Sequence, residues 1–260
     1  MSRFSKISLG DLFTLANGVL GFLAITYIYN RSFLAATSLL LLSMLMDGLD
    51  GQMARRFGSK HTMGQVLDSI SDAISFAFAP GILVYAELHD AASASPTFSV
   101  NNAVAITCAA AILATGLFRL ARFSSGGFQL DHFTGLPAPG AALVMILVCL
   151  LFGASSGSED QRYYFTISTE PVLVIVSGLL ISYLMSSEIR YPKLRGWMAG
   201  VSAIGILLAL VPTIAGLALV SDQDLYTAFS RTATGLALVL TLAYVFGGPA
   251  YEKLARGKGG

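Results

Sequence analysis

The chain has 260 residues, of which 55% are hydrophobic and only 12% are charged. Soluble domains carry about 25% charged residues, so this composition argues against a soluble protein, and the abundance of apolar side chains argues against disorder. With 16 basic and 15 acidic residues the net charge is +1, and without a basic stripe nucleic acid is not expected as a partner. Cys108 and Cys149 lie in apolar runs and show neither metal-site spacing nor a disulfide framework.

Eight apolar stretches approach the roughly 20 residues that a membrane-spanning helix needs. They predict an all-α, polytopic integral membrane bundle, because the runs are continuous, whereas the strands of a membrane barrel alternate. We expect one membrane domain over residues 1–260, with a six-helix core in 1–187 and two additional helices in 188–260. In chain order the stretches cover residues 12–29, 33–54, 66–88, 102–122, 137–153, 171–187, 197–219 and 228–249.

The basic residues indicate the orientation of this bundle. If the eight helices alternate in direction, all but three of the 16 lysines and arginines fall on one side, and the exceptions are Arg31, Arg162 and Arg231. The positive-inside rule assigns the basic side to the cytoplasm. We therefore expect both termini and the 55–64 loop on the cytoplasmic side of the cell membrane.

Four aspartates interrupt the apolar pattern at the cytoplasmic ends of the second and third stretches. Asp47 and Asp50 are spaced i,i+3 and Asp68 and Asp72 are spaced i,i+4, so each pair shares one helix face. The short connection makes the two helices antiparallel neighbours, and the pairs can face each other. A single acidic pair near a helix end is often only a solvated cap, but acids inside membrane helices are costly and generally functional.

Clustered carboxylates in a medium of low dielectric either raise each other's pKa or recruit a cation. Oxygen-only ligands suit Mg²⁺, Mn²⁺ or Ca²⁺, and four carboxylates are enough for two bridged ions, an arrangement suited to phosphoryl transfer. The intervening residues favour phosphate: Gly51 and Gly64 permit close approach, Ala54 leaves room, Arg55 offers a forked donor, and Lys60 adds positive potential.

A cation or proton transporter is the alternative from another functional class, because transporters also use intramembrane acids. Such proteins tend to show repeated halves with broken helices. The last four stretches contain no second acidic cluster. The pattern therefore favours an enzyme.

The sequence around the aspartates resembles the signature of the CDP-alcohol phosphatidyltransferase family, which is Asp-x₂-Asp-Gly-x₂-Ala-Arg, about eight residues, and Gly-x₃-Asp-x₃-Asp. Residues 47–55 read DGLDGQMAR and residues 64–72 read GQVLDSISD, so every constrained position matches. The resemblance implies the CDP-alcohol phosphotransferase fold and the transfer of a phosphatidyl group from a CDP-linked lipid to an alcohol, with release of CMP. Relatives of this kind are usually homodimers.

The resemblance also implies roles for individual residues. Asp47, Asp50, Asp68 and Asp72 would ligate two divalent cations (Mg²⁺ or Mn²⁺, with Ca²⁺ a further option), and Asp72 would be the general base on the acceptor hydroxyl. The residues expected at the CDP moiety are Asn17, Asp47, Gly51, Ala54, Arg55, Gly64 and Asp68.

The choice of acceptor alcohol depends on the later cytoplasmic segments. Residues 118–123 (FRLARF) and 187–192 (SEIRYP) are similar to the serine-accepting branch of the family, and eight helices suit that branch. The expected substrates are then CDP-diacylglycerol or CDP-archaeol and L-serine, with glycerol 3-phosphate or an inositol phosphate as the alternative acceptor. Candidates for binding serine or the lipid phosphate are Lys60, Arg119, Arg122 and Arg190, although each could instead be a simple positive-inside anchor.

Overall fold

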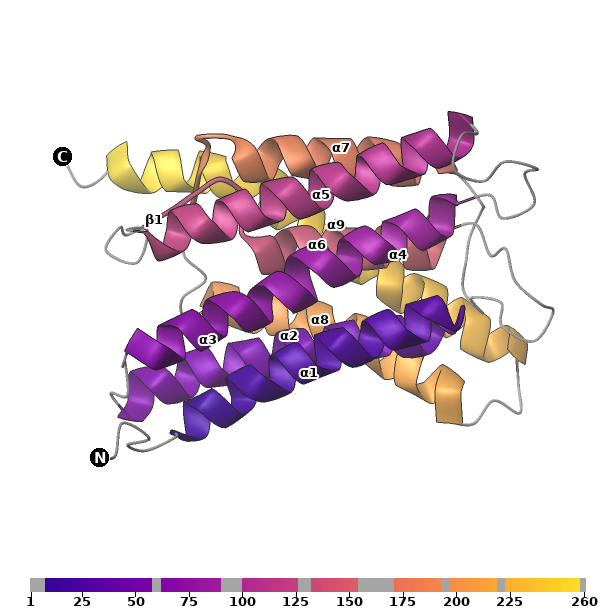
Figure 1. Cartoon of the computed structure of the whole chain (residues 1–260), viewed down its shortest axis with the longest axis horizontal. Helices are drawn as coiled ribbons and strands as arrows, with labels where there is room; N and C mark the ends of the chain where they lie inside the picture. The colour runs from indigo at the N-terminus through magenta and orange to yellow at the C-terminus, as the bar shows by residue number, and fades with distance from the viewer. Residues whose placement is uncertain are drawn as a thin grey trace.

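The computed structural model describes residues 8–57, 62–89, 100–125, 132–153, 171–192, 197–218 and 223–257, and it confirms a helical membrane bundle (Figure 1). All eight stretches expected from the sequence are helical within these ranges. The helices are α1 (Leu9–Tyr29), α2 (Phe33–Phe57), α3 (Thr62–Ala73), η1 (Ile74–Phe78), α4 (Ala79–Leu88), α5 (Val100–Ser124), α6 (Ala138–Phe152), α7 (Pro171–Ser186), α8 (Trp197–Ala218) and α9 (Gln223–Gly257).

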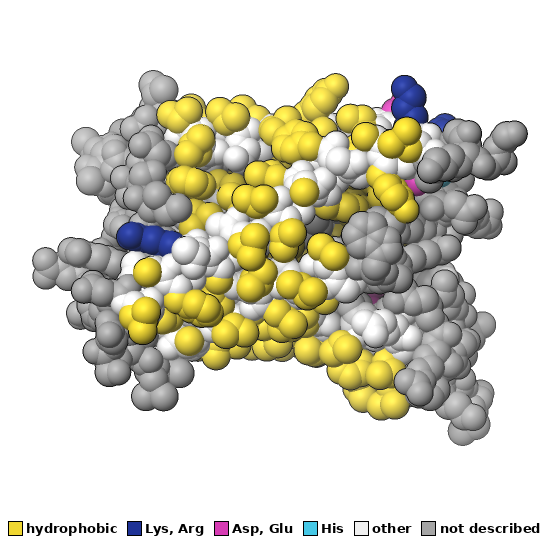
Figure 2. Space-filling view, turned by 180° about the vertical axis from the view of Figure 1, so that it is seen from behind, with side chains coloured by type: hydrophobic (Ala, Val, Ile, Leu, Met, Phe, Trp, Pro, Cys, Tyr) yellow, Lys and Arg dark blue, Asp and Glu magenta, His cyan; other side chains and the backbone are white. Residues whose placement is uncertain are grey.

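Six helices in the described part of the chain are long and apolar enough to cross a membrane. Hydrophobic side chains spread over the face of the bundle in Figure 2, as expected for a surface that meets lipid. The six spans are Leu9–Tyr29, Phe33–Met53, Met63–Leu88, Asn102–Ser124, Gly200–Leu217 and Leu225–Leu254, and the shorter apolar helices are Ala138–Phe152 and Pro171–Ser186.

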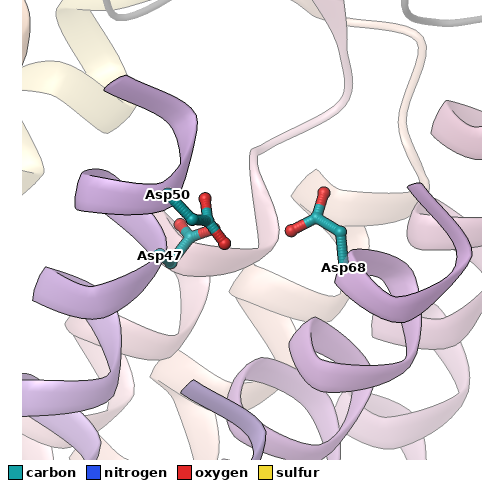
Figure 3. A group of neighbouring side chains, drawn as sticks. All are labelled: Asp47, Asp50 and Asp68. Atoms are coloured by element: carbon teal, nitrogen blue, oxygen red, sulfur yellow. The ribbon is translucent and has the colours of Figure 1, made fainter. Parts of the chain in front are cut away.

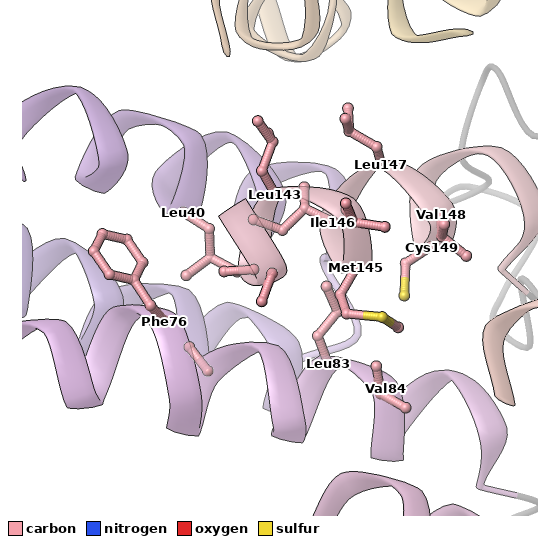
Figure 4. Packing of buried hydrophobic residues seen from close by; sticks show 14 of the residues in the cluster. Leu40, Phe76, Leu83, Val84, Leu143, Met145, Ile146, Leu147, Val148 and Cys149 are labelled. Atoms are coloured by element: carbon pink, nitrogen blue, oxygen red, sulfur yellow. The ribbon is translucent and has the colours of Figure 1, made fainter. Parts of the chain in front are cut away.

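Helix α6 forms the centre of the bundle. Twelve of its 15 residues are buried, and it packs against α2, α4, α7 and α9. Figure 4 shows side chains of α6 from Leu143 to Cys149 among Leu40, Phe76 and Leu83 of neighbouring helices. A helix that is apolar on every side is stable only when other helices surround it or lipid covers it. In this bundle the neighbouring helices surround α6 and bury its apolar side chains.

Helix α1 begins with a capping box. The Ser8 N–H donates to Asp11 Oδ2 at 2.7 Å, and the Asp11 N–H donates to Ser8 Oγ at 3.2 Å. The apolar residues of this helix, such as Leu12 and Phe22, are exposed, whereas its buried face is built from small and polar residues. This inverted pattern is typical of membrane helices, because lipid is as apolar as leucine and small residues allow close helix contact.

The third predicted stretch is one continuous helical rod in which the π-helical turn η1 joins α3 to α4. Pro80 lacks an N–H and cannot make the usual bond to the Phe76 carbonyl. The Ala79 N–H instead bonds the Ile74 carbonyl, five residues back. The π turn begins two residues after Asp72, and π turns often accompany functional sites.

A short antiparallel ribbon, which the sequence did not predict, joins two of the connections between helices. Strand β1 (His132–Thr134) pairs with β2 (Arg190–Pro192), and Phe133 lies opposite Tyr191. The ribbon lies at the end of the bundle where α1 begins and α9 ends (Figure 1). Helix α9 is also longer than the expected 228–249, because its polar ends stay helical beyond the apolar stretch.

Candidate active site

Three of the four aspartates meet where α2 faces α3. Asp47, Asp50 and Asp68 each place a carboxylate oxygen within 4.8 Å of the others. Figure 3 shows Asp47 and Asp50 on one helix and Asp68 on the facing helix, with their carboxylates turned toward a common space. The i,i+3 spacing puts both α2 carboxylates on one helix face, so the sequence pattern produces the cluster directly.

Helix α1 supplies hydrogen-bond donors to two of the carboxylates. Thr14 Oγ1 donates to Asp50 Oδ2 at 2.8 Å, and Asn17 Nδ2 donates to Asp72 Oδ1 at 3.0 Å. Asn17 is fully buried and Thr14 nearly so. Hydrogen bonds to a charged acceptor are stronger than neutral ones. The first helix therefore holds the carboxylates of the second and third in place.

Two glycines let α1 approach α3 and η1 closely enough for the bond from Asn17 to Asp72. A Cβ on Gly18 would lie 2.9 Å from Ser71 Oγ, and a Cβ on Gly21 would lie 2.9 Å from Ser75 Cα. The Ser75 hydroxyl also donates to the Asn17 carbonyl at 2.9 Å. Side chains at either glycine would separate the helices, so the reach of Asn17 to Asp72 depends on this packing.

Arg119 of α5 is the cationic counterpart of the cluster. Its side chain is only 5% exposed, and its positive charge interacts with the carboxylates of Asp72 and Asp47. Its guanidinium carbon is 5.3 Å from the ring centroid of Phe123 and also 5.3 Å from that of Phe133. The two rings contribute cation–π attraction and hold the guanidinium in place.

These groups line one cavity of about 1160 Å³. The four aspartates, Gly51 and Gly64 form its wall on α2 and α3, and Arg119 and Phe133 stand on α5 and β1. Further walls come from α6, α8 and α9. In the described part of the chain, Arg119 is the one cationic residue that lines this cavity.

Arg122, one turn beyond Arg119, is engaged differently. Its Nη2 atom donates to the backbone carbonyls of Thr134 at 2.5 Å and of Met185 and Ser187 at 3.3 Å each. It does not line the cavity and instead ties α5 to β1 and to the C-terminal end of α7. Arg122 therefore has a structural role, because its guanidinium binds backbone carbonyls and does not face the cavity where substrates would bind.

The remaining candidates from the sequence are placed as follows. Arg190 is exposed on β2, where it pairs with Thr134 and does not line the cavity. Lys60 lies outside the described residues, as do the side chains of Ala54 and Arg55.

Sequence reasoning missed several residues of the site. Thr14 stands one turn before Asn17, so the i,i+3 spacing could have indicated a shared inward face. Phe133 and Tyr244 also line the cavity. They carry no comparable signal, because aromatic residues near helix ends usually anchor a membrane protein at the interface.

The donor set of the cluster fits a divalent cation. Carboxylate oxygens from three residues converge, and hard oxygen ligands are those that Mg²⁺, Mn²⁺ and Ca²⁺ prefer. Five acidic residues, Asp11 and the four aspartates of the motif, line the described part of the cavity wall together with a single arginine. Because burying several like charges is costly, a bound cation would balance the remaining charge.

Comparisons with known proteins relate most of the chain to one family. Residues 7–184 match the model of the CDP-alcohol phosphatidyltransferase family. The chain is 36% identical over 196 residues to an archaetidylserine synthase of Methanothermobacter thermautotrophicus, covering 74% of this chain and 72% of that protein. It is 34% identical over 206 residues to a CDP-diacylglycerol–serine O-phosphatidyltransferase of Methanocaldococcus jannaschii (79% and 84% covered), and 30% identical over 190 residues to the protein so named from Helicobacter pylori (71% and 72%). With its motif, its helical bundle and its carboxylate cluster, the chain belongs to the CDP-alcohol phosphatidyltransferase family.

Proposed function

We propose that this membrane protein transfers the lipid phosphate of CDP-diacylglycerol or CDP-archaeol to the hydroxyl of L-serine and releases CMP. The observation that carries the proposal is one cavity in which, among the described residues, a carboxylate cluster faces a single buried guanidinium, that of Arg119. Relatives named for serine transfer align with most of the chain. The transporter alternative rested on the intramembrane aspartates. Membership in a family of transferases accounts for these aspartates without a transport function.

The charge of the cavity favours serine over phosphorylated acceptors. Serine carries one carboxylate and one ammonium group. The Arg119 guanidinium lies near the rings of Phe123 and Phe133, and its N–H edge can bind a carboxylate in bidentate fashion. The nearby aspartates attract the ammonium group. Glycerol 3-phosphate or an inositol phosphate would bring about two negative charges and would require more cations than the described residues of this wall provide.

The reaction balances with the groups in place. The serine hydroxyl oxygen forms a bond to the lipid-linked phosphorus, and the bond from that phosphorus to the CMP oxygen breaks, so CMP departs with the electron pair. The hydroxyl proton passes to the Asp72 carboxylate, which the Asn17 amide holds at 3.0 Å, and later to water. A positioned carboxylate is needed because the free hydroxyl has a pKa far above 7.

Asp47, Asp50 and Asp68 would hold the divalent cations, with Asp72 completing the set for two ions. Bound Mg²⁺ or Mn²⁺ (or Ca²⁺) would neutralise charge on the pyrophosphate and on the departing CMP. Gly51 and Gly64 line the cavity wall and leave room for the nucleotide. Ala54 and Arg55 are assigned to the same CDP contact by the family motif.

The proposal extends to topology and assembly. We infer that the end of the bundle with both termini faces the cytoplasm, where CDP-lipid and serine meet, because basic residues concentrate there. Residues 1–187 would form the catalytic core, with 188–260 adding α8 and α9. A homodimer is expected by analogy with the family.

A CMP-release assay on purified protein tests the proposal. The protein is supplied with CDP-diacylglycerol or CDP-archaeol, Mg²⁺ or Mn²⁺, and one alcohol at a time: L-serine, glycerol 3-phosphate or an inositol phosphate. We expect CMP release that depends on L-serine. Release with a phosphorylated alcohol but not with serine would overturn the acceptor assignment, and the absence of release with all three would overturn the enzyme assignment.

A further inference from the structure

Helices α8 and α9 lie beyond the segment that matches the family model, yet they form part of the cavity wall. The match ends at residue 184, whereas Ile206 of α8 and Tyr244 of α9 line the same cavity as the aspartates. Helix α8 packs against α2, and α9 packs against α6 and β2. The additional pair of helices is therefore placed to influence what the site binds.

Tyr244 fastens α9 to the ribbon. Its hydroxyl donates to the Pro192 carbonyl at 3.1 Å, and its ring centroid lies 6.0 Å from that of Tyr191. One turn later, a Cβ on Gly248 would lie 3.3 Å from Pro192 Cδ and 3.5 Å from Tyr191 Cδ1. The absence of a side chain at Gly248 lets β2 lie directly on α9.

The β1–β2 ribbon connects Tyr244 to Arg119 through a series of side-chain contacts. Tyr191 of β2 lies opposite Phe133 of β1, and the Phe133 ring is 5.3 Å from the Arg119 guanidinium carbon. Tyr244 and Arg119 also lie within electrostatic range of each other. A continuous series of contacts thus runs from α9 through β2 and β1 to the buried cation of the active site.

We propose that Tyr244 is a positioning residue for the acceptor: by holding the ribbon against α9 it keeps Arg119 aligned to bind the carboxylate of serine. The inference rests on the proposed serine transfer. It assigns to α9 a role in acceptor affinity that is separate from binding of the CDP-lipid, because the aspartates and Gly64 belong to other helices. Loosening the ribbon should therefore weaken serine binding and leave the donor site intact.

The test compares Tyr244→Phe with Tyr226→Phe. Each variant removes one phenol hydroxyl of α9 that donates to a proline carbonyl, Pro192 for Tyr244 and Pro212 for Tyr226. Tyr226 does not line the cavity, so it is a matched control. We expect Tyr244→Phe to raise the KM for serine about fivefold, the effect of one lost hydrogen bond. The KM for CDP-lipid, and kcat at saturating serine, should stay within about twofold of wild type.

A double-mutant cycle shows whether Tyr244 acts through Arg119. In an Arg119→Lys background, Tyr244→Phe should add little to the KM for serine, because the planar guanidinium that it positions is gone. If Tyr244→Phe raises the KM for serine by the same factor in the wild-type and Arg119→Lys backgrounds, the mechanism is overturned.

A second variant tests the same contact by a different route. Gly248→Leu would place a branched side chain against Pro192 and lift the ribbon, whereas Gly235→Leu on the same helix has open space at its Cβ. We expect only the first to raise the KM for serine. If the two leucine variants agree, or if Tyr244→Phe leaves that KM unchanged while wild type uses serine, the inference is overturned and the proposed function stands. If wild type does not use serine, both are overturned.

Discussion

Replacing Gly21 with alanine should push α1 away from the rod that bears Asp72. The new Cβ would lie 2.9 Å from Ser75 Cα and 3.1 Å from Ser75 Cβ, whereas ordinary contacts begin at 3.4 Å. The helices must therefore separate by about 0.5 Å. Asn17 lies one turn from Gly21, and a shift of that size would stretch its 3.0 Å bond to Asp72 to the limit of hydrogen bonding.

The expected cost follows from the lost bond. A hydrogen bond to a charged group contributes about 1.5–3 kcal/mol, and 1.36 kcal/mol corresponds to a factor of ten in rate. If Asp72 is the base that Asn17 orients, kcat for CMP release should fall about 10- to 100-fold. The KM for serine should change little, because Arg119 lies on a different helix. Asn17→Ala should reproduce the loss, and combining it with Gly21→Ala should add little.

Gly200→Ala is the matched control for this prediction. Gly200 is exposed on α8, and a Cβ there meets nothing within 4 Å. Both substitutions gain the same helix propensity, about 1 kcal/mol. Full activity in Gly21→Ala, or an equal loss in both variants, would refute the idea that close packing of α1 holds Asp72 in position. Thermal unfolding of both proteins separates this effect from general destabilisation.

Three further predictions address the chemistry of the site. Asp72→Asn should retain CDP-lipid binding, measured by titration, but lower turnover at least about 100-fold, since a general base contributes roughly 10²–10⁴; a variant that still turns over would remove Asp72 from this role. Exhaustive chelation should abolish CMP release, and Mg²⁺ or Mn²⁺ should restore it; activity that survives chelation would argue against the cation site. Arg119→Gln should raise the KM for serine about tenfold or more through loss of a charge-assisted pair, whereas Arg122→Gln should mainly lower the unfolding temperature. Identical kinetics in the two glutamine variants would contradict the different roles of these arginines.

Much of the fold follows from local sequence signals. Runs of apolar residues predicted all eight helical stretches, because a helix satisfies its own backbone in lipid. The boundaries were less accurate. Helix α9 extends over Gln223–Gly257, since its polar ends can remain helical in water, where hydropathy carries no information about helix ends. The ribbon of β1 and β2 was missed because three-residue strands leave no periodic pattern.

The aspartate cluster was predictable for a similar reason. Spacings of three and four residues place side chains on one helix face, and a short connection lets α2 and α3 face each other while both pack on α1. The support from α1 was not predictable, since it depends on how closely two helices pack. Gly18 and Gly21 resemble other small residues of membrane helices in the sequence, and their role emerges only from the positions of Ser71 and Ser75.

Arg119 and Arg122 show most clearly where local signals end. They are three residues apart on one helix. From the sequence alone, both are basic residues near a cytoplasmic helix end, and nothing distinguishes a ligand-binding arginine from a structural one. Their environments differ because β1 returns to α5: its Phe133 ring lies beside the Arg119 guanidinium, and its Thr134 carbonyl accepts from Arg122. Phe133 and Thr134 lie too far along the chain from these arginines for a helical repeat to indicate the contacts. A buried cation without such partners would be costly, so the ribbon decides which arginine can remain in the cavity as a ligand for an anionic group.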